Sequence, residues 1–349
     1  LVMLKERPKR ILITRLRFIG DVVLTTPVIR AIRRAYPQAE IIYLAEAEPA
    51  SILEHDPDLN GIIVLDRDHI STLPMGQQWR EYFHLFRRIR AYRFDLVIDL
   101  FCNPRSALLT LLSGARYRLG YDVRGRGWVY NLKIKRLASI RVLDAYLDAV
   151  RTLGISGEDD RTNISISCAE ATWASTYLAD CFGSDDKPVI GIIPGASWPA
   201  KMWGSDQFGD LINRLVSGYG AHILIIQGPG QEKIIEAVRG EIRHRHEIVK
   251  TTSLMCLAAL MHQCALFISN DCGPMHMAVA VGTPTIGLFG PSRSDIWFPY
   301  RQEEGHLPLR PDIKDCCGKD VCIQSSPCIR QIPVDDVFKA AGLLLSNGI

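Results

Sequence analysis

The chain has 349 residues, of which 47% are hydrophobic and 23% are charged, and 41 Lys and Arg against 38 Asp and Glu give a net charge of +3. This composition is typical of a globular protein and excludes a disordered, collagen-like or coiled-coil chain. The net charge is too small for a protein that binds duplex DNA, so we expect no nucleic acid partner. The length predicts two domains.

The sequence predicts neither a membrane span nor a secretion signal. No apolar stretch approaches the ~20 residues that cross a bilayer, and no apolar core follows the basic residues at the N-terminus. We therefore expect a cytoplasmic protein.

Short apolar runs alternate with amphipathic segments through both halves of the chain. Runs of four to six apolar residues without polar alternation are typical of strands buried on both faces of a parallel sheet. The amphipathic segments repeat apolar residues at helical spacing, as Val22, Ile29, Ile32 and Tyr36 do. The predicted strands are 11–14, 41–45, 62–65 and 95–100 in the first half, and 189–194, 222–227, 266–269 and 285–289 in the second. This alternation predicts an α/β protein with doubly wound parallel sheets.

The alternation of predicted strands and helices begins again at residue 188. Polar stretches before this point lie on either side of one predicted helix. We expect a first domain over 1–165, a connector over 166–187, a second domain over 188–332 and a C-terminal helix over 333–349. Ligands of such domains bind at the carboxyl ends of the strands, so we expect a cleft between the two sheets.

The segment between the first predicted strand and the first helix holds one glycine, Gly20, followed by Asp21. Without a G-x-G-x-x-G pattern, dinucleotide binding of the NAD type is disfavoured. Asp21 has two interpretations that the residues leave open, a helix N-cap and a catalytic carboxylate. Pro27 either kinks a helix that begins at Asp21 or opens a second helix capped by Thr26.

Two segments of the second half follow predicted strands and suit an anion. In the first, Gly195 and Ser197 allow backbone N–H groups to approach a phosphate and Lys201 supplies a charge, although a plain loop with an exposed lysine fits as well. In the second, Gly273 and Pro274 open a helix whose first N–H groups attract an anion.

Asp271 and His276 flank that helix start. Asp271 would repel a phosphate, so it either binds sugar hydroxyls or caps the helix. His276 is a packed structural histidine or a donor contact.

These segments together resemble glycosyltransferase family 9, the ADP-heptose:lipopolysaccharide heptosyltransferases. The motifs are Arg-Phe-Ile-Gly-Asp-Val-Val-Leu-Thr-Thr-Pro (17–27), Pro-Gly-Ala-Ser-x3-Lys-x-Trp (194–203), Asp-x-Gly-x2-His-x-Ala (271–278) and Leu-Phe-Gly-Pro (288–291). The resemblance implies a GT-B fold, in which two Rossmann-like domains face each other across a cleft. In this fold the C-terminal helix over 333–349 crosses back to the first domain and is grouped with it. The resemblance further implies that the first domain binds the acceptor and the second binds the nucleotide-sugar donor. It also implies inverting transfer of heptose from ADP-heptose to the inner core of lipopolysaccharide, with no required cofactor and no metal.

The resemblance implies a role for residues at matching positions. Asp21 matches the general base, and Ser197 and Lys201 match contacts to the donor phosphates, beside Gly195. Asp271 and Gly273 match the site of the donor heptose and diphosphate, with His276 in the same motif. Glu232 corresponds to an acidic residue near the donor ribose. The chain departs from the family at Cys272, where a hydroxyl is usual, and at Arg15, on the acceptor side, where a lysine is often found.

A basic stretch over 116–136 includes Arg124 and Arg126. It is either a solvated loop or a contact to a lipid A-core oligosaccharide acceptor and an anionic membrane surface. The second interpretation predicts a peripheral enzyme on the inner face of the inner membrane.

Four cysteines crowd near the end of the chain, at Cys316, Cys317, Cys322 and Cys328. Their spacing lacks the C-x2-C pairs of a zinc ribbon, and the sequence leaves thiols, disulfides and a metal site open.

Two other functions remain alternatives to heptosyl transfer. A nucleotide-sugar epimerase of GT-B shape would need further acid/base residues that the sequence does not place. A non-catalytic sugar-binding protein would give Asp21 no role.

Overall fold

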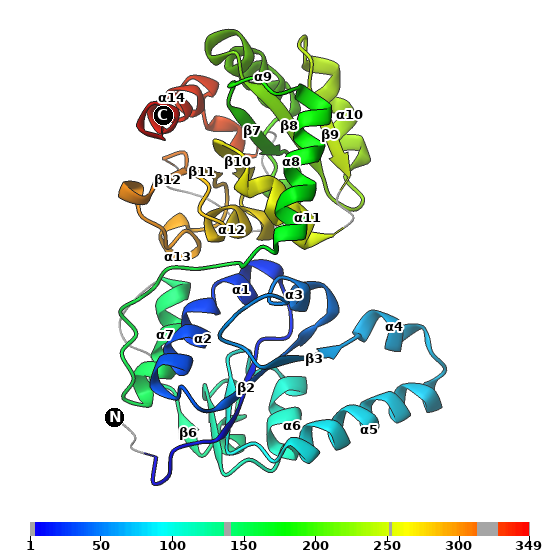
Figure 1. The fold of residues 1–349 in the computed structure, drawn as a ribbon, viewed down its shortest axis with the longest axis vertical. Coiled ribbons are helices and arrows are strands. Elements are labelled where there is room, and N and C mark those ends of the chain that lie inside the picture. Colours follow the sequence, from blue (N-terminus) through cyan, green and yellow to red (C-terminus); the bar gives the residue numbers. More distant parts are fainter. Residues whose placement is uncertain (1–3, 136–140, 251–252, 313–326, 349) are drawn as a thin grey trace. The chain divides into compact units, whose positions relative to one another are not determined.

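The computed structural model describes residues 4–135, 141–250, 253–312 and 327–348. The chain divides into two compact units, Leu1–Ser165 and Ile166–Ile349, and each unit is built on a six-stranded sheet (Figure 1).

All strands of the first sheet are parallel, in the order β3-β2-β1-β4-β5-β6. Its strands are β1 (Arg10–Thr14), β2 (Glu40–Glu46), β3 (Gly61–Leu65), β4 (Leu96–Asp99), β5 (Tyr117–Gly120) and β6 (Leu132–Lys133). Its helices are α1 (Ile19–Val23), α2 (Thr26–Ala35), α3 (Ala47–Ser51), α4 (Arg67–Thr72), α5 (Met75–Tyr92), α6 (Pro104–Leu112) and α7 (Val142–Thr152). The strand order reverses between β1 and β4, the point at which doubly wound sheets bind ligands.

The second sheet repeats this topology, because its order reads β9-β8-β7-β10-β11-β12 and its strands are again parallel. The strands are β7 (Val189–Ile193), β8 (His222–Gln227), β9 (Glu247–Lys250), β10 (Leu266–Asn270), β11 (Thr285–Leu288) and β12 (His306–Leu309). The helices are α8 (Cys168–Phe182), α9 (Ser205–Tyr219), α10 (Glu232–Glu241), α11 (Leu254–His262), α12 (Gly273–Ala280), α13 (Ser294–Trp297) and α14 (Val334–Gly348). The predicted fold class, doubly wound α/β with two parallel sheets, is confirmed.

The central strands form because apolar side chains are buried on both faces of each sheet. Ile11 and Ile13 of β1, on opposite faces from Leu12, are all essentially inaccessible to solvent. The same holds for Ile190 and Ile192 of β7. Burial of this kind holds the carboxyl ends of the strands, and the loops that follow them, in fixed positions.

Helix α14 differs from its expected grouping with the first unit. Its apolar stripe, Val337, Ala341, Leu344 and Leu345, is buried in the core of the second unit, where the helix packs against α9. The residues expected to form a connector are also mainly helical, since α8 begins at a capping box of Ser167 and Glu170 and packs against α11. The second unit therefore holds α14 in its apolar core and α8 against its helix α11.

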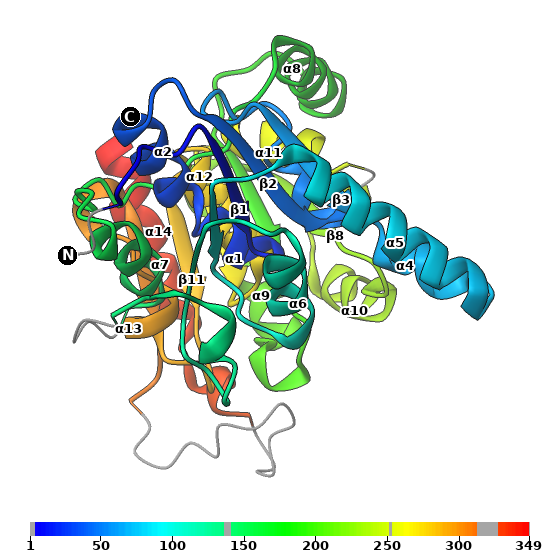
Figure 2. The same ribbon diagram turned by 90° about the horizontal axis from the view of Figure 1, so that it is seen from below.

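Helices α4 and α5 project from the first unit, away from its sheet (Figure 2). The second half of α5 joins the core through Leu85 and Ile89, and Tyr82 is partly buried against the same core. Within the described residues, no helix combines the length and the apolar content that crossing a bilayer requires.

Candidate functional site

In the first unit, three buried side chains meet just beyond the carboxyl end of β1. Asp21 Oδ1 accepts a hydrogen bond from the Tyr146 hydroxyl at 2.5 Å and pairs with Arg15 Nη2 at 2.9 Å. Arg15 Nε donates to the same Tyr146 hydroxyl at 3.1 Å, which closes a triangle. No described residue is bonded to Asp21 Oδ2, so this oxygen is the one available to a ligand.

Asp21 is not a helix cap. It is the third residue of α1, and the N-cap is Phe18, whose φ of 70° lies in the left-handed region. The N-cap interpretation is therefore wrong, and the side chain points instead to Arg15 and Tyr146. Pro27 lies in a separate helix, α2, which starts at Thr26.

The surroundings of Asp21 fix the protonation of its partners. Burial and the negative charge of Asp21 raise the pKa of Tyr146 well above its usual value, so the phenol stays a donor. Burial alone would lower the pKa of Arg15, but Tyr146 and Asp21 outweigh it and the pKa is raised. The Arg15 guanidinium also lies 4.0 Å from the ring centroid of Phe101, which follows β4. A charged arginine and a neutral tyrosine thus hold one oxygen of the carboxylate.

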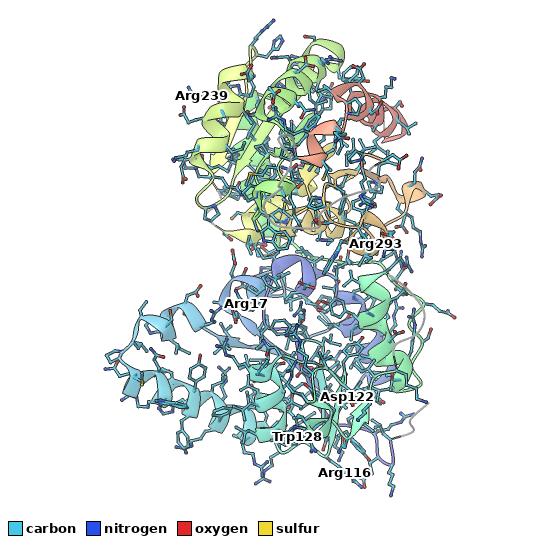
Figure 3. All side chains as sticks on the ribbon, turned by 180° about the vertical axis from the view of Figure 1, so that it is seen from behind. Arg17, Arg116, Asp122, Trp128, Arg239 and Arg293 are labelled. Carbon is cyan, nitrogen blue, oxygen red and sulfur yellow. The ribbon has the colours of Figure 1, made fainter. Side chains whose placement is uncertain are left out.

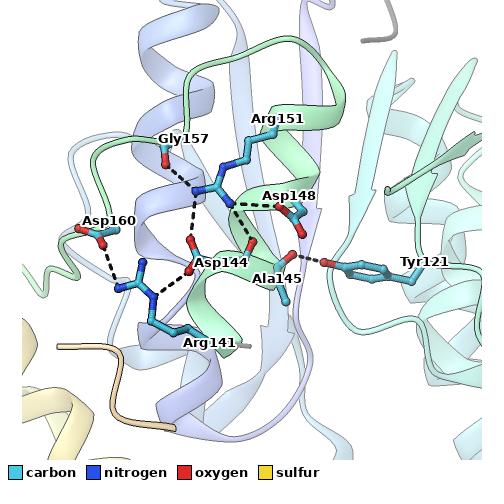
Figure 4. A network of polar contacts seen from close by, with 8 residues as sticks. All are labelled: Tyr121, Arg141, Asp144, Ala145, Asp148, Arg151, Gly157 and Asp160. Atoms are coloured by element: carbon cyan, nitrogen blue, oxygen red, sulfur yellow. Dashed lines mark hydrogen bonds and ion pairs between the residues drawn. The ribbon is translucent and has the colours of Figure 1, made fainter. Parts of the chain in front are cut away.

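Helix α7, which carries Tyr146, is anchored by a network of ion pairs (Figure 4). Arg151 pairs with Asp144 and Asp148 at 3.1 Å each, and Arg141 pairs with Asp144 at 2.7 Å. Arg151 also donates to the carbonyl of Gly157, which ties the helix to the segment that follows it. Because Asp144 and Asp148 are buried and fully paired, the network holds the orientation of α7 and hence of Tyr146.

A second cluster lies at the carboxyl end of β2, where three arginines surround Glu46. Arg17 and Arg105 come within 3.6 Å of its carboxylate and Arg67 within 3.9 Å. Burial raises the pKa of Glu46 even though the three guanidiniums oppose it. One carboxylate shared among three guanidiniums leaves positive charge at this sheet edge.

In the second unit, the predicted phosphate-binding lysine is paired with the predicted aspartate. Lys201 Nζ donates to Asp271 Oδ2 at 2.6 Å, and both side chains are mostly buried. Lys201 ends a short 3-10 helix after β7, and Asp271 directly follows β10, the neighbouring strand. The ammonium also lies 4.8 Å from the ring centroid of Trp198. The sheet therefore brings the second and third motifs together.

The buried side chain of Asn270 joins these two loops. Its amide donates to the carbonyl of Pro194 at 2.7 Å, and its oxygen accepts from the backbone N–H of Trp203 at 3.2 Å. Both bonds are inaccessible to water, so nothing replaces them when they are lost.

We expect Asn270→Ala to lower the free energy of unfolding by about 1–3 kcal/mol, because it leaves a buried carbonyl and a buried N–H without partners. The measurement is a urea titration. Asn213→Ala is the matched control: Asn213 also bridges two segments by donating to a carbonyl and accepting from an N–H, but near solvent. An equal loss in both variants would contradict the role given to Asn270.

The other residues predicted on the donor side lie at the same sheet edge. Gly195 approaches Gln231 so closely that an added Cβ would lie 2.1 Å from its side chain, and Glu232 opens α10 beyond β8 with its side chain exposed. Ser197 is exposed after β7. Gly273 is the first residue of α12, which has no side-chain cap.

The side chains of Cys272 and His276 contact other residues of the second unit. The thiol of Cys272 lies 3.3 Å from the Ser269 hydroxyl, and burial raises its pKa to about 11, so it stays neutral. His276 is buried and its Nδ1 lies 2.7 Å from the hydroxyl of Tyr300. The structure thus places His276 against an aromatic cluster.

Comparisons with known proteins identify the family of the chain. The family model described as "Glycosyltransferase family 9 (heptosyltransferase)" matches residues 82–323, which is more than half of the chain. The chain belongs to glycosyltransferase family 9. It is therefore a glycosyltransferase, neither an epimerase nor a non-catalytic sugar-binding protein.

Three similar proteins illustrate the match. Lipopolysaccharide heptosyltransferase 3 of Escherichia coli K12 is 30% identical over 95% of this chain and 96% of its own. The crystal structure of a family 9 glycosyltransferase from Veillonella parvula has a TM-score of 0.85, with 25% identity and 97% of each chain covered. E. coli heptosyltransferase WaaC with ADP-2-deoxy-2-fluoro heptose has a TM-score of 0.73, with 19% identity over 96% of this chain and 99% of that one. The neighbours show that the enzyme has the GT-B fold.

Most of the described basic side chains over 116–135 of this glycosyltransferase form ion pairs or hydrogen bonds within the first unit. Arg116 pairs with Glu6, Lys133 pairs with Asp122, and Arg118 donates to two backbone carbonyls. Three acceptor contacts were predicted. Arg15 is buried against Asp21, Arg126 donates to the carbonyl of Cys102, and Arg124 is exposed in a tight loop. Trp128 in the same stretch is exposed (Figure 3).

The cysteine cluster falls largely outside the described residues, since only Cys328 is described, and its thiol is buried. Within the part of the chain that the structure describes, no three His, Cys, Asp or Glu side chains gather as metal ligands would. Cys316, Cys317 and Cys322 lie outside the described residues.

Proposed function

We propose that this glycosyltransferase moves a heptose from ADP-heptose to the inner core of lipopolysaccharide, with inversion at the anomeric carbon. The observation that carries the proposal is that the two units hold different chemical groups. The first unit holds the buried carboxylate of Asp21, which has one available oxygen. The second holds Lys201 and the N-terminus of α12, which has no side-chain cap. The names of the relatives supply the sugar and the acceptor class.

The second unit binds the donor. The Lys201 ammonium and the backbone N–H groups near Gly195 and Gly273 neutralise the diphosphate as it leaves. Asp271 orients Lys201 and accepts hydrogen bonds from sugar hydroxyls. Ser197 adds a phosphate contact, Glu232 lies toward the ribose, and the neighbouring Cys272 and His276 shape the pocket. Because Lys201 supplies the positive charge, transfer should need no cofactor and should persist in EDTA.

The first unit activates the acceptor. Asp21 Oδ2 takes the proton of the acceptor hydroxyl while that oxygen forms a bond to the anomeric carbon. The bond between this carbon and the diphosphate oxygen breaks, and ADP leaves with the electron pair. A single displacement of this kind inverts the configuration. Arg15 and Tyr146 hold the carboxylate in position.

The acceptor is the anionic lipid A-core oligosaccharide. Its phosphates and carboxylates are attracted by the guanidiniums around Glu46, with Arg124 and Arg126 as further contacts. We propose that the enzyme works as a peripheral protein at the anionic inner face of the inner membrane, in the cytoplasm.

A thermal-shift series with ADP, UDP, GDP and NAD tests the donor class. A ligand at 1,000 times its Kd that binds only the folded state adds about 4 kcal/mol to the free energy of unfolding. We expect ADP to stabilise the enzyme most. A preference for UDP, or no effect of any nucleotide, would refute an ADP-linked donor.

We expect Lys201→Ala to weaken ADP binding by about 1.5–3 kcal/mol, because the phosphates lose a charge-assisted partner and Asp271 is left to repel them. Titration calorimetry with ADP gives the measurement. In Lys201→Ala/Asp271→Asn the repulsion is removed, so part of the affinity should return. Unchanged ADP affinity in the single variant would show that the diphosphate binds elsewhere.

A further inference from the structure

The first half of α5 exposes an apolar stripe that the fold does not use. Met75, Trp79 and Phe83 follow one another at a spacing of four residues, which places them along one face of the helix. Their exposed fractions are 75%, 70% and 58%. From residue 75 to residue 84 no side chain of α5 is buried, whereas Leu85 and Ile89 fix the second half to the core.

Unpaired positive charge accompanies the stripe. Arg80, Arg87 and Arg88 are exposed, and no described residue forms an ion pair with any of them. Glu81 is the only acidic residue of α5. The cations of the basic stretch over 116–136 differ in this respect, since Arg116 and Lys133 are paired with acids.

This combination matches the chemistry of a bilayer surface better than that of a protein partner. A tryptophan with apolar neighbours on one side of a helix and arginines beside them suits the boundary between headgroups and acyl chains. Long arginine side chains reach anionic headgroups while their stems lie on apolar surface. A stable protein interface buries ~800 Å² on each partner, more than three side chains on a projecting helix provide.

We propose that α5 docks on an anionic lipid bilayer along this exposed face, with Met75, Trp79 and Phe83 inserted among the headgroups and Arg80 and Arg87, which project beside the stripe, bound to lipid phosphates. The inference rests on the proposed function only for its biological setting, a lipid-anchored acceptor. Binding to vesicles can be measured without any transfer reaction.

The test is flotation of the full chain with vesicles of phosphatidylcholine alone and of phosphatidylcholine with phosphatidylglycerol at a ratio of three to one. We expect binding to the anionic vesicles, and at least a tenfold loss in Met75→Ser/Trp79→Ser/Phe83→Ser. Because these side chains are exposed, the variant should keep its melting temperature and ADP affinity. Trp128→Ser removes an equally exposed tryptophan, and we expect it to float like the wild type.

A second pair of variants tests the charges. Each cation near an anionic surface contributes roughly a fivefold change in binding at low salt, so Arg80→Gln/Arg87→Gln should lose at least tenfold. Lys233→Gln/Arg239→Gln removes two exposed cations from the second unit and should change little.

Three outcomes would overturn the proposal. One is equal flotation of the wild type and both α5 variants, and another is loss of flotation in Trp128→Ser, which would place docking on 116–136. The third is a concentration-dependent dimer in sedimentation velocity that the apolar variant abolishes while flotation stays unchanged. Normal transfer to a soluble, deacylated acceptor alongside any of these would leave the proposed function standing.

Discussion

Asp21→Asn is expected to reduce the transfer rate at least a hundredfold while the enzyme remains folded. Loss of a general base typically costs ~10²–10⁴ in rate, because the acceptor hydroxyl must then attack without giving up its proton. The asparagine oxygen still accepts the hydrogen bonds of Tyr146 and Arg15, so the geometry of the site is kept. The measurement is the rate at saturating donor and acceptor.

ADP affinity is the control for this variant, because we propose that the donor binds the other unit. Asn leaves the buried Arg15 guanidinium without a carboxylate, so we expect some loss of stability, but the variant should still unfold cooperatively in urea. Retention of most of the activity in a folded Asp21→Asn protein would remove Asp21 as the base. A variant that no longer folds and no longer binds ADP would instead assign the carboxylate a structural role.

Arg15→Met is expected to lower the free energy of unfolding strongly. Removing one partner of a buried ion pair leaves an uncompensated charge and typically costs ~3–5 kcal/mol. Both side chains of this pair are about nine-tenths buried, so water cannot take the place of the guanidinium. A urea titration should therefore show that the free energy of unfolding falls by about 3–5 kcal/mol.

The double variant Arg15→Met/Asp21→Asn separates the charge from the packing. With the carboxylate gone, we expect most of the lost stability to return while transfer stays low. A double variant no more stable than Arg15→Met would mean that the arginine acts through its stacking on Phe101 and not through Asp21.

The central strands were predictable because burial on both faces leaves a continuous apolar run, as in Ile-Leu-Ile-Thr of β1 and Ile-Gly-Ile-Ile of β7. Strands β5, β6, β9 and β12 were not predicted. β6 is the dipeptide Leu-Lys, and β12 contains a proline. Such edge strands bury less side chain, so their residues carry less apolar pattern.

Local motifs predicted the residues at the strand ends but not their partners. Lys201 and Asp271 were both identified, yet only the pairing of β7 with β10 shows that they form an ion pair. Tyr146 lies 125 residues from Asp21 on the apolar face of an ordinary amphipathic helix, and nothing near it in the sequence marks it. The cluster of arginines around Glu46 was missed for the same reason, because Arg17 precedes α1, Arg67 begins α4 and Arg105 lies in α6.

The most direct test of the proposed reaction is a mass-spectrometric assay with ADP-heptose and a series of truncated lipopolysaccharide cores. We predict that one acceptor of the series gains the mass of a single heptose, with release of an equal amount of ADP, and that Asp21→Asn gives at least a hundredfold less product. Addition of a sugar from a UDP-linked donor, with none from ADP-heptose, would contradict the proposal.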